Sequence, residues 1–374
     1  MLAPGRLHTT VLAVLLLAPV ALTQEKGGQE EFGHYEHVAN WPQPLPGPDN
    51  QAWTWGSTGG VYAESPDRIW IGMRGQLPLP EKGKPGDSVG LHKMNANQLR
   101  PKTRWTNQVI VVDRDGKLVQ SFTQHDELLA KGAKGPHQIN MSPYDPDKHV
   151  WVVSDSGHAV FKFTNDGKLV MTLGEVGVKG EDEGHFNEPT DLAWFPDGSF
   201  VVADGYINSR VVKFDKNGKF LTTWGSKGTD PGQFQVPHSI ATDKNRRVYV
   251  ADRSNKRIQV FDENGKFLDM WPNMTSPYTI LMGKDQHLWV GDGTTNRISK
   301  YDANGKFLYG WGISATIRAG AQPGWFDGPH QMSVDQEGNL YVAEVWSGRV
   351  QKFRPKKGAD PAKLLQSELR WPTS

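Results

Sequence analysis

The fold of this chain is decided by a stretch that begins Tyr249-Val250-Ala251-Asp252 and ends Asn264-Gly265-Lys266. Its first part, an apolar pair followed by a small residue and an acid, recurs four times: Val152-Val153-Ser154-Asp155, Val201-Val202-Ala203-Asp204, Trp289-Val290-Gly291-Asp292 and Tyr341-Val342-Ala343-Glu344. A sixth copy, Trp70-Ile71-Gly72-Met73, lacks the acid. These repeats are the first indication that the chain is built from copies of one unit.

The second part of the stretch, an Asn-Gly or Asp-Gly turn followed by lysine, also recurs, with its glycines at Gly116, Gly167, Gly218, Gly265 and Gly305. Such a turn between β-branched and aromatic runs predicts a hairpin in which both turn residues have positive φ. Successive glycines are 51, 51, 47 and 40 residues apart, and a period of this size with four strands per copy is typical of a propeller. We therefore predict an all-β chain that folds as a six-bladed β-propeller.

The repeats resemble NHL repeats. The resemblance is carried by three short runs, Gly232-Gln233-Phe234-Gln235-Val236-Pro237, Asn255-Lys256-Arg257 and Val260-Phe261, together with the acid-ending pattern above. It implies a propeller fold and leaves the function open, because propellers support many chemistries as well as pure binding surfaces.

The composition excludes several classes of protein. The chain has 374 residues, with 41 glycines, 25 prolines and no cysteine, so disulfides, thiolate metal sites and a cysteine nucleophile are excluded. Lys and Arg total 42 against 41 for Asp and Glu, so the near-neutral balance does not favour nucleic acid as a partner.

We expect three regions. Arg6 and His8 precede an apolar run over residues 11–22, which is typical of a secretory signal, so we predict a signal peptide over 1–23 and a secreted or extracytoplasmic protein without a membrane span. An extended, proline-rich lead-in follows over 24–52, and the propeller occupies 53–374. Residues 75–106 interrupt blade 1, and we predict that this insertion is a lid.

Histidines stand at alternate blades. In blades 2 to 6 the residue after the proline at the start of the blade is His137 in blade 2, His238 in blade 4 and His330 in blade 6, whereas blades 3 and 5 have Thr190 and Tyr278. Blade 1 has Gly60 nearby and no such proline. Sixfold geometry places the three histidines about 120° apart, so their imidazoles can converge on a catalytic zinc ion. The alternative is that each histidine satisfies backbone groups.

Other polar residues end the second strand of each repeat, on the same face as the histidines. These include Arg74, Tyr206 and Arg253. A tyrosine can serve as a general base only if cations lower its pKa, which we expect of Arg253 and of the metal; the alternative is a ring that packs over the channel mouth. The repeated acids are followed five or six residues on by arginines, such as Asp252 by Arg257, which predicts structural ion pairs.

The chain also resembles the peptidyl-α-hydroxyglycine α-amidating lyases. The resemblance is carried by Gly135-Pro136-His137, Pro189-Thr190-Asp191, Asp204-Gly205-Tyr206-Ile207-Asn208-Ser209-Arg210, Val236-Pro237-His238-Ser239 and Ala251-Asp252-Arg253. It implies a zinc ion held by His137, His238 and His330, a catalytic Tyr206, and active-site arginines at Arg253 and Arg74. It further implies cleavage of a carbinolamide to a peptide amide and glyoxylate.

This chain departs from the family at two site positions. Gly328 stands where the family has a methionine, and Gln331 stands where the family has an aspartate that helps to hold a structural calcium ion. The alternative function is therefore a non-catalytic NHL propeller that binds a peptide, glycan or envelope partner on its top face. A calcium-dependent lactonase is a weaker alternative, because a hard cation prefers oxygen ligands to three histidines. We expect a monomer that acts on a small-molecule or peptide substrate.

Overall fold

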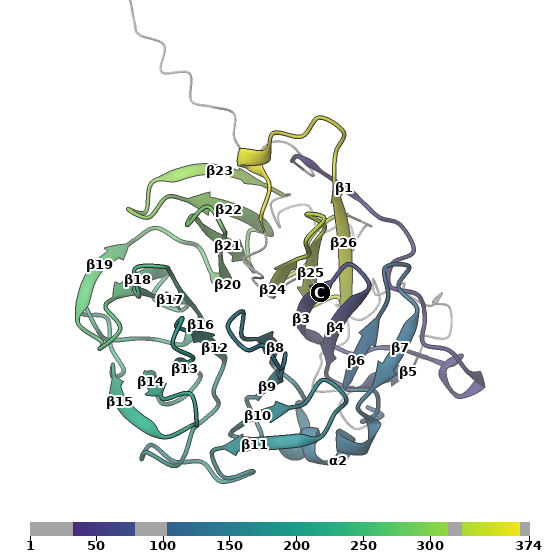
Figure 1. Cartoon of the computed structure of the whole chain (residues 1–374), viewed down its shortest axis with the longest axis horizontal. Coiled ribbons are helices and arrows are strands. Elements are labelled where there is room, and N and C mark those ends of the chain that lie inside the picture. Colours follow the sequence, from purple (N-terminus) through teal and green to yellow (C-terminus); the bar gives the residue numbers. More distant parts are fainter. Residues whose placement is uncertain (1–32, 79–102, 313–323, 367–374) are drawn as a thin grey trace, which may run out of the picture.

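The computed structural model describes residues 33–78, 103–312 and 324–366. Six four-stranded antiparallel sheets are arranged as blades around a central axis, as Figure 1 shows. The prediction of an all-β, six-bladed propeller is confirmed. The predicted signal peptide over 1–23 and most of the predicted lid, residues 79–102, lie outside the described residues.

The first three blades follow the chain from their inner to their outer strands. Blade 1 contains β3 (Thr58–Ser65), β4 (Arg68–Met73), β6 (Val109–Val112) and β7 (Leu118–Ser121). Blade 2 contains β8 (Gln138–Met141), β9 (Val150–Ser154), β10 (Ala159–Phe163) and β11 (Leu169–Leu173). Blade 3 contains β12 (Asp191–Trp194), β13 (Phe200–Asp204), β14 (Arg210–Phe214) and β15 (Phe220–Trp224).

Blades 4 and 5 repeat this order, and blade 6 closes the ring. Blade 4 contains β16 (Pro237–Thr242), β17 (Val248–Asp252), β18 (Arg257–Phe261) and β19 (Phe267–Trp271). Blade 5 contains β20 (Pro277–Met282), β21 (Leu288–Asp292), β22 (Arg297–Tyr301) and β23 (Phe307–Trp311). Blade 6 contains β24 (Pro329–Val334), β25 (Leu340–Glu344) and β26 (Arg349–Pro355), with β1 (Tyr35–His37) as its outer strand.

Strand β1 corrects the predicted start of the propeller. Tyr35 pairs with Pro355 and His37 with Phe353, so a segment from within the predicted lead-in completes the last blade. The Tyr35 side chain is fully buried and stacks on Trp311 of blade 5. The propeller is therefore closed by residues that precede position 53, because the outer edge of blade 6 needs a hydrogen-bonding partner.

Several short elements lie outside the six blades. At the start of the blade 1 insertion, β5 (Gln76–Pro78) pairs with β2 (Trp53–Trp55). In the described part of the chain the helical segments are α2 (Asp126–Leu129), η1 (Pro48–Asn50), η4 (Thr123–His125), η5 (Lys131–Ala133) and η6 (Pro361–Lys363).

The Gly-Lys turns differ in detail from the prediction. The glycine has positive φ, as at Gly265 (88°), but the asparagine before it does not. In blade 4 the Gly265 N–H bonds to the Asp262 carbonyl, and the Asp262 carboxylate accepts from the N–H groups of Asn264 and Lys266. This is a type I turn followed by one left-handed glycine, so only one of the two predicted positive φ angles is needed.

The hydrophobic core lies between the blades. Each buried cluster draws side chains from two adjacent blades, and an aromatic residue of the second strand is often at its centre, as with Trp151 between blades 2 and 3 and Tyr249 between blades 4 and 5. One blade therefore cannot bury its faces alone.

The repeated acids form the predicted structural ion pairs in three blades. Arg257 Nε lies 2.7 Å from Asp252 Oδ2, and the same pairing joins Asp204 to Arg210 and Glu344 to Arg349. At Asp292 the carboxylate accepts instead from the backbone N–H groups of Ser276, Thr294 and Thr295.

Candidate metal centre

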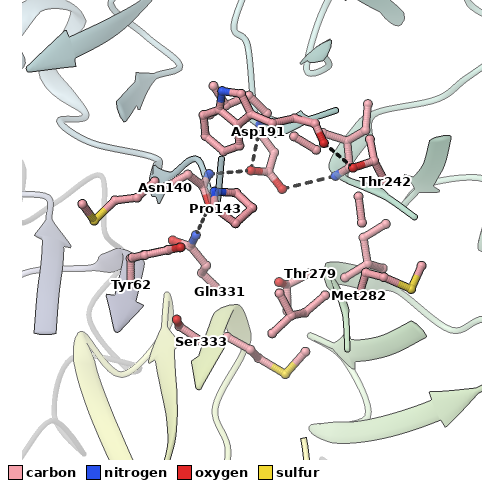
Figure 2. A pocket seen from close by; sticks show the side chains of 18 of the residues that line it. Tyr62, Asn140, Pro143, Asp191, Thr242, Thr279, Met282, Gln331 and Ser333 are labelled. Carbon is pink, nitrogen blue, oxygen red and sulfur yellow. Dashed lines mark hydrogen bonds between the residues drawn. The ribbon is translucent and has the colours of Figure 1, made fainter. Parts of the chain in front are cut away.

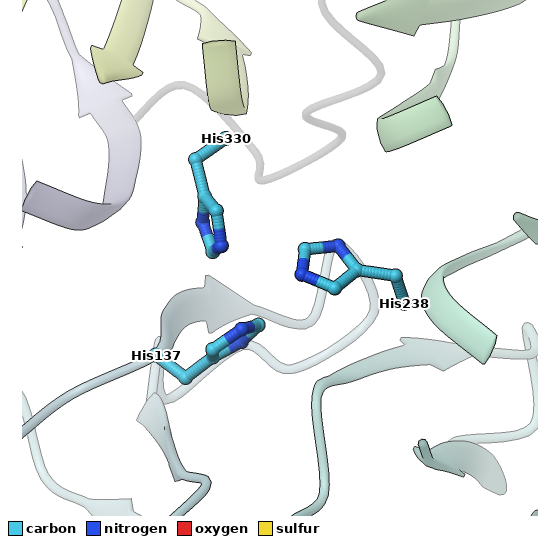
Figure 3. Close-up of side chains that lie close together, drawn as sticks. All are labelled: His137, His238 and His330. Carbon is cyan, nitrogen blue, oxygen red and sulfur yellow. The ribbon is translucent and has the colours of Figure 1, made fainter. Parts of the chain in front are cut away.

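The three predicted histidines meet on the axis. Figure 3 shows their rings directed at one point from three sides. The ring centroids of His137, His238 and His330 are 4.6 to 5.0 Å apart, and one nitrogen of each lies within 4.8 Å of the others. All three side chains are buried. The structure thus brings together residues that are separated by about a hundred positions in sequence.

Each histidine is oriented by a carbonyl of the next blade. His137 Nδ1 donates to the Thr190 carbonyl (2.7 Å), His238 Nδ1 to Tyr278 (2.6 Å) and His330 Nδ1 to Gly59 (2.8 Å). The acceptors in blades 3, 5 and 1 occupy the same repeat position as the histidines in blades 2, 4 and 6. The alternative interpretation, that each histidine satisfies a backbone group, therefore holds for Nδ1 of each ring. It leaves the Nε2 atom of each ring facing the axis.

The surroundings of the three histidines favour their neutral form. Burial lowers the pKa of each ring well below its usual value. The Arg253 guanidinium lowers the pKa of all three rings further, and the Arg74 guanidinium lowers that of His137 and His330. With Nδ1 carrying the proton, each Nε2 presents a lone pair. Three neutral imidazole nitrogens with their Nδ1–H groups tied back are the ligand set of a catalytic zinc site, so these residues fit a zinc ion.

Tyr206 touches two of the candidate ligands. Its hydroxyl oxygen lies 3.0 Å from His137 Nε2 and 3.0 Å from His238 Nε2. The preceding Gly205 makes this approach possible, since a Cβ there would lie 1.9 Å from the Pro237 carbonyl oxygen. Burial raises the pKa of Tyr206 above its usual value, although Arg253 and Arg74 lower it. The sequence predicts that Arg253 makes this phenol more acidic. In the protein alone, burial has a larger effect on the pKa of Tyr206 than Arg253 does.

The two predicted arginines have different partners. Arg74 Nη2 forms an ion pair with Asp155 Oδ2 at 3.1 Å, and the Asp155 side chain is almost completely buried. Arg253 instead lies over two aromatic rings, 5.2 Å from the centroid of Tyr206 and 4.9 Å from that of Tyr278. In the described part of the chain, no carboxylate lies within ion-pair distance of Arg253.

Asp155 and Lys134 are site residues that sequence reasoning missed. Lys134 Nζ lies 3.8 Å from Asp155 and 3.1 Å from Glu188. A signal for Asp155 was present: the other repeat acids are followed by arginine five or six positions later, but Asp155 is followed there by Val160-Phe161. An acid without the arginine of its own repeat indicates a partner elsewhere, and that partner is Arg74.

The space beside Gly328 is filled by Trp346. A Cβ at Gly328 would lie 2.0 Å from Trp346 Cδ1, so the indole occupies the volume that a side chain at 328 would need. Gly328 has a φ of 71°, and Val236 adopts 63° at the same position of blade 4, so the backbone alone does not require glycine here. Half of the Trp346 surface is exposed. The resemblance implies a methionine at this position, and in this chain the Trp346 indole fills the space that such a side chain would need.

Farther along the inner strands, Gln331 occupies the position of the implied calcium ligand. Figure 2 shows this part of the channel, a cavity of about 130 Å³. Gln331 Nε2 donates to the Ile139 carbonyl (2.7 Å) and to Asn140 Oδ1 (2.9 Å), while Oε1 accepts from the Val61 and Ile139 N–H groups. The amide N–H groups already satisfy oxygens that a hard cation would need, so these residues do not fit a calcium ion at Gln331.

Known proteins match this chain both in single repeats and over longer segments. The NHL repeat family matches residues 234–261 and 326–353, which lie in blades 4 and 6. The chain is 31% identical over 235 residues to the peptidyl-glycine alpha-amidating monooxygenase of Mus musculus, a match that covers 59% of this chain and 21% of that protein. It is 36% identical over 152 residues to a probable peptidyl-alpha-hydroxyglycine alpha-amidating lyase of Caenorhabditis elegans, covering 40% and 41% of the two chains.

The chain is a six-bladed propeller in which two blades match the NHL repeat, and it resembles the amidating lyases. These matches span less than half of the relatives' own lengths. A solved streptogramin B lyase covers 81% of this chain and 94% of its own with a TM-score of 0.53, and at 12% identity it supports the propeller fold alone. Within the described residues, no helix has the length and apolar character needed to cross a membrane.

Proposed function

We propose that this protein is a zinc-dependent lyase that cleaves a peptidyl-α-hydroxyglycine-type carbinolamide into an amide and glyoxylate. The observation that carries the proposal is the contact of the Tyr206 hydroxyl with two of three converging imidazole nitrogens. The apolar run over residues 11–22 supports action outside the cytoplasm.

The reaction needs a proton to move without net redox change. The substrate's hydroxyl O–H bond and its C–N bond break, the aldehyde C=O bond forms, and the nitrogen gains a proton. Zinc held by His137, His238 and His330 would supply Lewis acidity toward a substrate oxygen. Tyr206 lies at this point of the site, and as the phenolate its oxygen could take the hydroxyl proton and pass it to the leaving nitrogen. The positive charges of Arg253, Arg74 and a bound zinc ion would favour this ionised form against the effect of burial.

We assign different roles to the two arginines. Sequence reasoning assigned the substrate carboxylate to Arg74, but Arg74 is already paired with Asp155. Arg253 lies beside Tyr206 without such a partner among the described residues, so we assign the carboxylate to Arg253. Arg74, held by Asp155, keeps a positive charge near the ligands and contributes to the neutral state of His137 and His330.

The test is glyoxylate release from α-hydroxyhippurate by zinc-loaded protein. Release that is abolished by chelation and restored by zinc supports the proposal, and Arg253→Ala should raise KM for this substrate more than Arg74→Ala does. Zinc-loaded protein that binds one ion per chain and releases no glyoxylate contradicts the lyase and favours the binding-module alternative.

A further inference from the structure

We propose that Tyr278 is a positioning residue that holds Arg253 for a substrate carboxylate, and so selects ligands with a carboxylate beside the reacting carbon. The inference rests on the proposed function for its substrate class. Its starting point is blade 5, which places a tyrosine where blades 4 and 6 place candidate zinc ligands.

Tyr278 is fixed at the metal centre by its backbone and its ring. It lies in β20, and its carbonyl accepts the His238 Nδ1–H at 2.6 Å. Its ring centroid is 5.3 Å from that of His238 and 6.1 Å from that of His330. The aromatic face therefore borders the site between two of the three histidines.

Gly293 leaves room for this ring. A Cβ at Gly293 would lie 2.5 Å from both Cγ and Cδ2 of Tyr278. Gly293 occupies the repeat position that Arg253 occupies in blade 4, since their N–H groups bond at 3.0 Å to the Ser276 and Val236 carbonyls. In blade 5 the side chain is absent at this position, and the tyrosine ring lies over the backbone instead.

The ring in turn supports the guanidinium of Arg253. The Arg253 Cζ is 4.9 Å from the Tyr278 centroid and 5.2 Å from the Tyr206 centroid. A planar guanidinium that lies over aromatic faces keeps its N–H groups at its edge, where they match a carboxylate bidentately. Tyr278 thus acts on a ligand through Arg253, and this role needs the aromatic face and not the hydroxyl.

The experiment measures binding, so that it does not depend on turnover. Zinc-loaded full chain is titrated calorimetrically with hippurate, which carries the carboxylate but no hydroxyl to react, and with hippuramide, its neutral analogue. We expect wild type to prefer hippurate, Tyr278→Phe to stay within about twofold of wild type, and Tyr278→Leu to bind hippurate about tenfold more weakly with hippuramide unchanged. Gly293→Ala, which displaces the Tyr278 ring without removing it, should also lower the affinity for hippurate.

Tyr301→Leu, a substitution at the end of β22, the third strand of the same blade, is the matched control and should bind both probes as wild type does. Three outcomes overturn the inference: wild type shows no preference for hippurate, Tyr278→Leu binds hippurate as tightly as wild type does, or Tyr278→Leu loses affinity equally for both probes. Loss of zinc in Tyr278→Phe and Tyr278→Leu also overturns it, because the residue would then act through His238. Hippurate selectivity without glyoxylate release contradicts the proposed reaction and leaves the role of Tyr278 standing.

Discussion

Arg74 of blade 1 and Asp155 of blade 2 form an ion pair across a blade boundary, with Nη2 and Oδ2 3.1 Å apart. In blades 3, 4 and 6 the corresponding acid pairs with an arginine of its own blade. Blade 2 has no such arginine, and the cation that replaces it comes from the neighbouring blade and stands beside the candidate metal centre.

Breaking this pair should destabilise the protein. Asp155→Asn leaves a mostly buried guanidinium without its carboxylate, so we expect a loss of about 3 kcal/mol in the free energy of unfolding. Arg74→Met combined with Asp155→Asn should cost less than the sum of the two single changes. Urea unfolding of the four proteins measures this coupling, with exposed Asp147→Asn as the control; strict additivity would mean that the pair contributes nothing.

Removal of the Tyr206 hydroxyl should slow the proposed reaction without loss of metal. For Tyr206→Phe we expect glyoxylate release to fall by about 10² to 10⁴, since a general acid–base group typically contributes this much. Zinc content and the melting temperature should match those of wild type. Equal rates in the two proteins would remove Tyr206 from the mechanism and favour the simple packing role.

The histidines should bind one zinc ion per chain as a set. His238→Ala, and equally His137→Ala, should lose most of the bound zinc because two imidazoles cannot complete the site. His287→Ala is the matched control, since that ring lies outside the centre and contacts Asp285. Metal analysis after dialysis gives the stoichiometry, and retention of zinc by both site variants would contradict the metal centre.

The protein should not depend on calcium. Because the Gln331 amide already donates to the Ile139 carbonyl and to Asn140, we expect EGTA and added calcium to leave the melting temperature unchanged. Gln331→Asp removes both donors and adds a charge, so this variant should melt lower and recover part of its stability with calcium. A fall in the melting temperature of wild type on treatment with EGTA would show that a cation acts here after all.

Asp191 should make stability depend on pH. It is buried among four hydrogen-bond donors, and burial raises its pKa from 3.8 to about 6. The folded state therefore holds a proton that the unfolded chain has released, so the stability that this group contributes is present below about pH 4 and is lost as the pH rises through 6. The stability of wild type relative to Asp191→Asn should thus fall by up to about 3 kcal/mol between pH 4 and 7. Urea unfolding at several pH values measures it, and a difference that rises with pH would reverse the assignment.

The sequence by itself determined the number of blades and the identity of the three histidines. Both follow from repetition: a copy that recurs every 40 to 51 residues must place equivalent positions at equal angles around one axis. Departures from the repeat, at His137 and its two equivalents, therefore point to the same place without knowledge of any contact.

Only the tertiary structure decided which groups touch across blade boundaries. The carbonyl that orients each histidine, the pairing of Arg74 with Asp155, the Gln331 amide bonded to blades 1 and 2, and the closing strand β1 all join positions far apart in the chain. Such contacts depend on how adjacent sheets pack and on which buried polar group must find a partner, and no local pattern of residues encodes that choice.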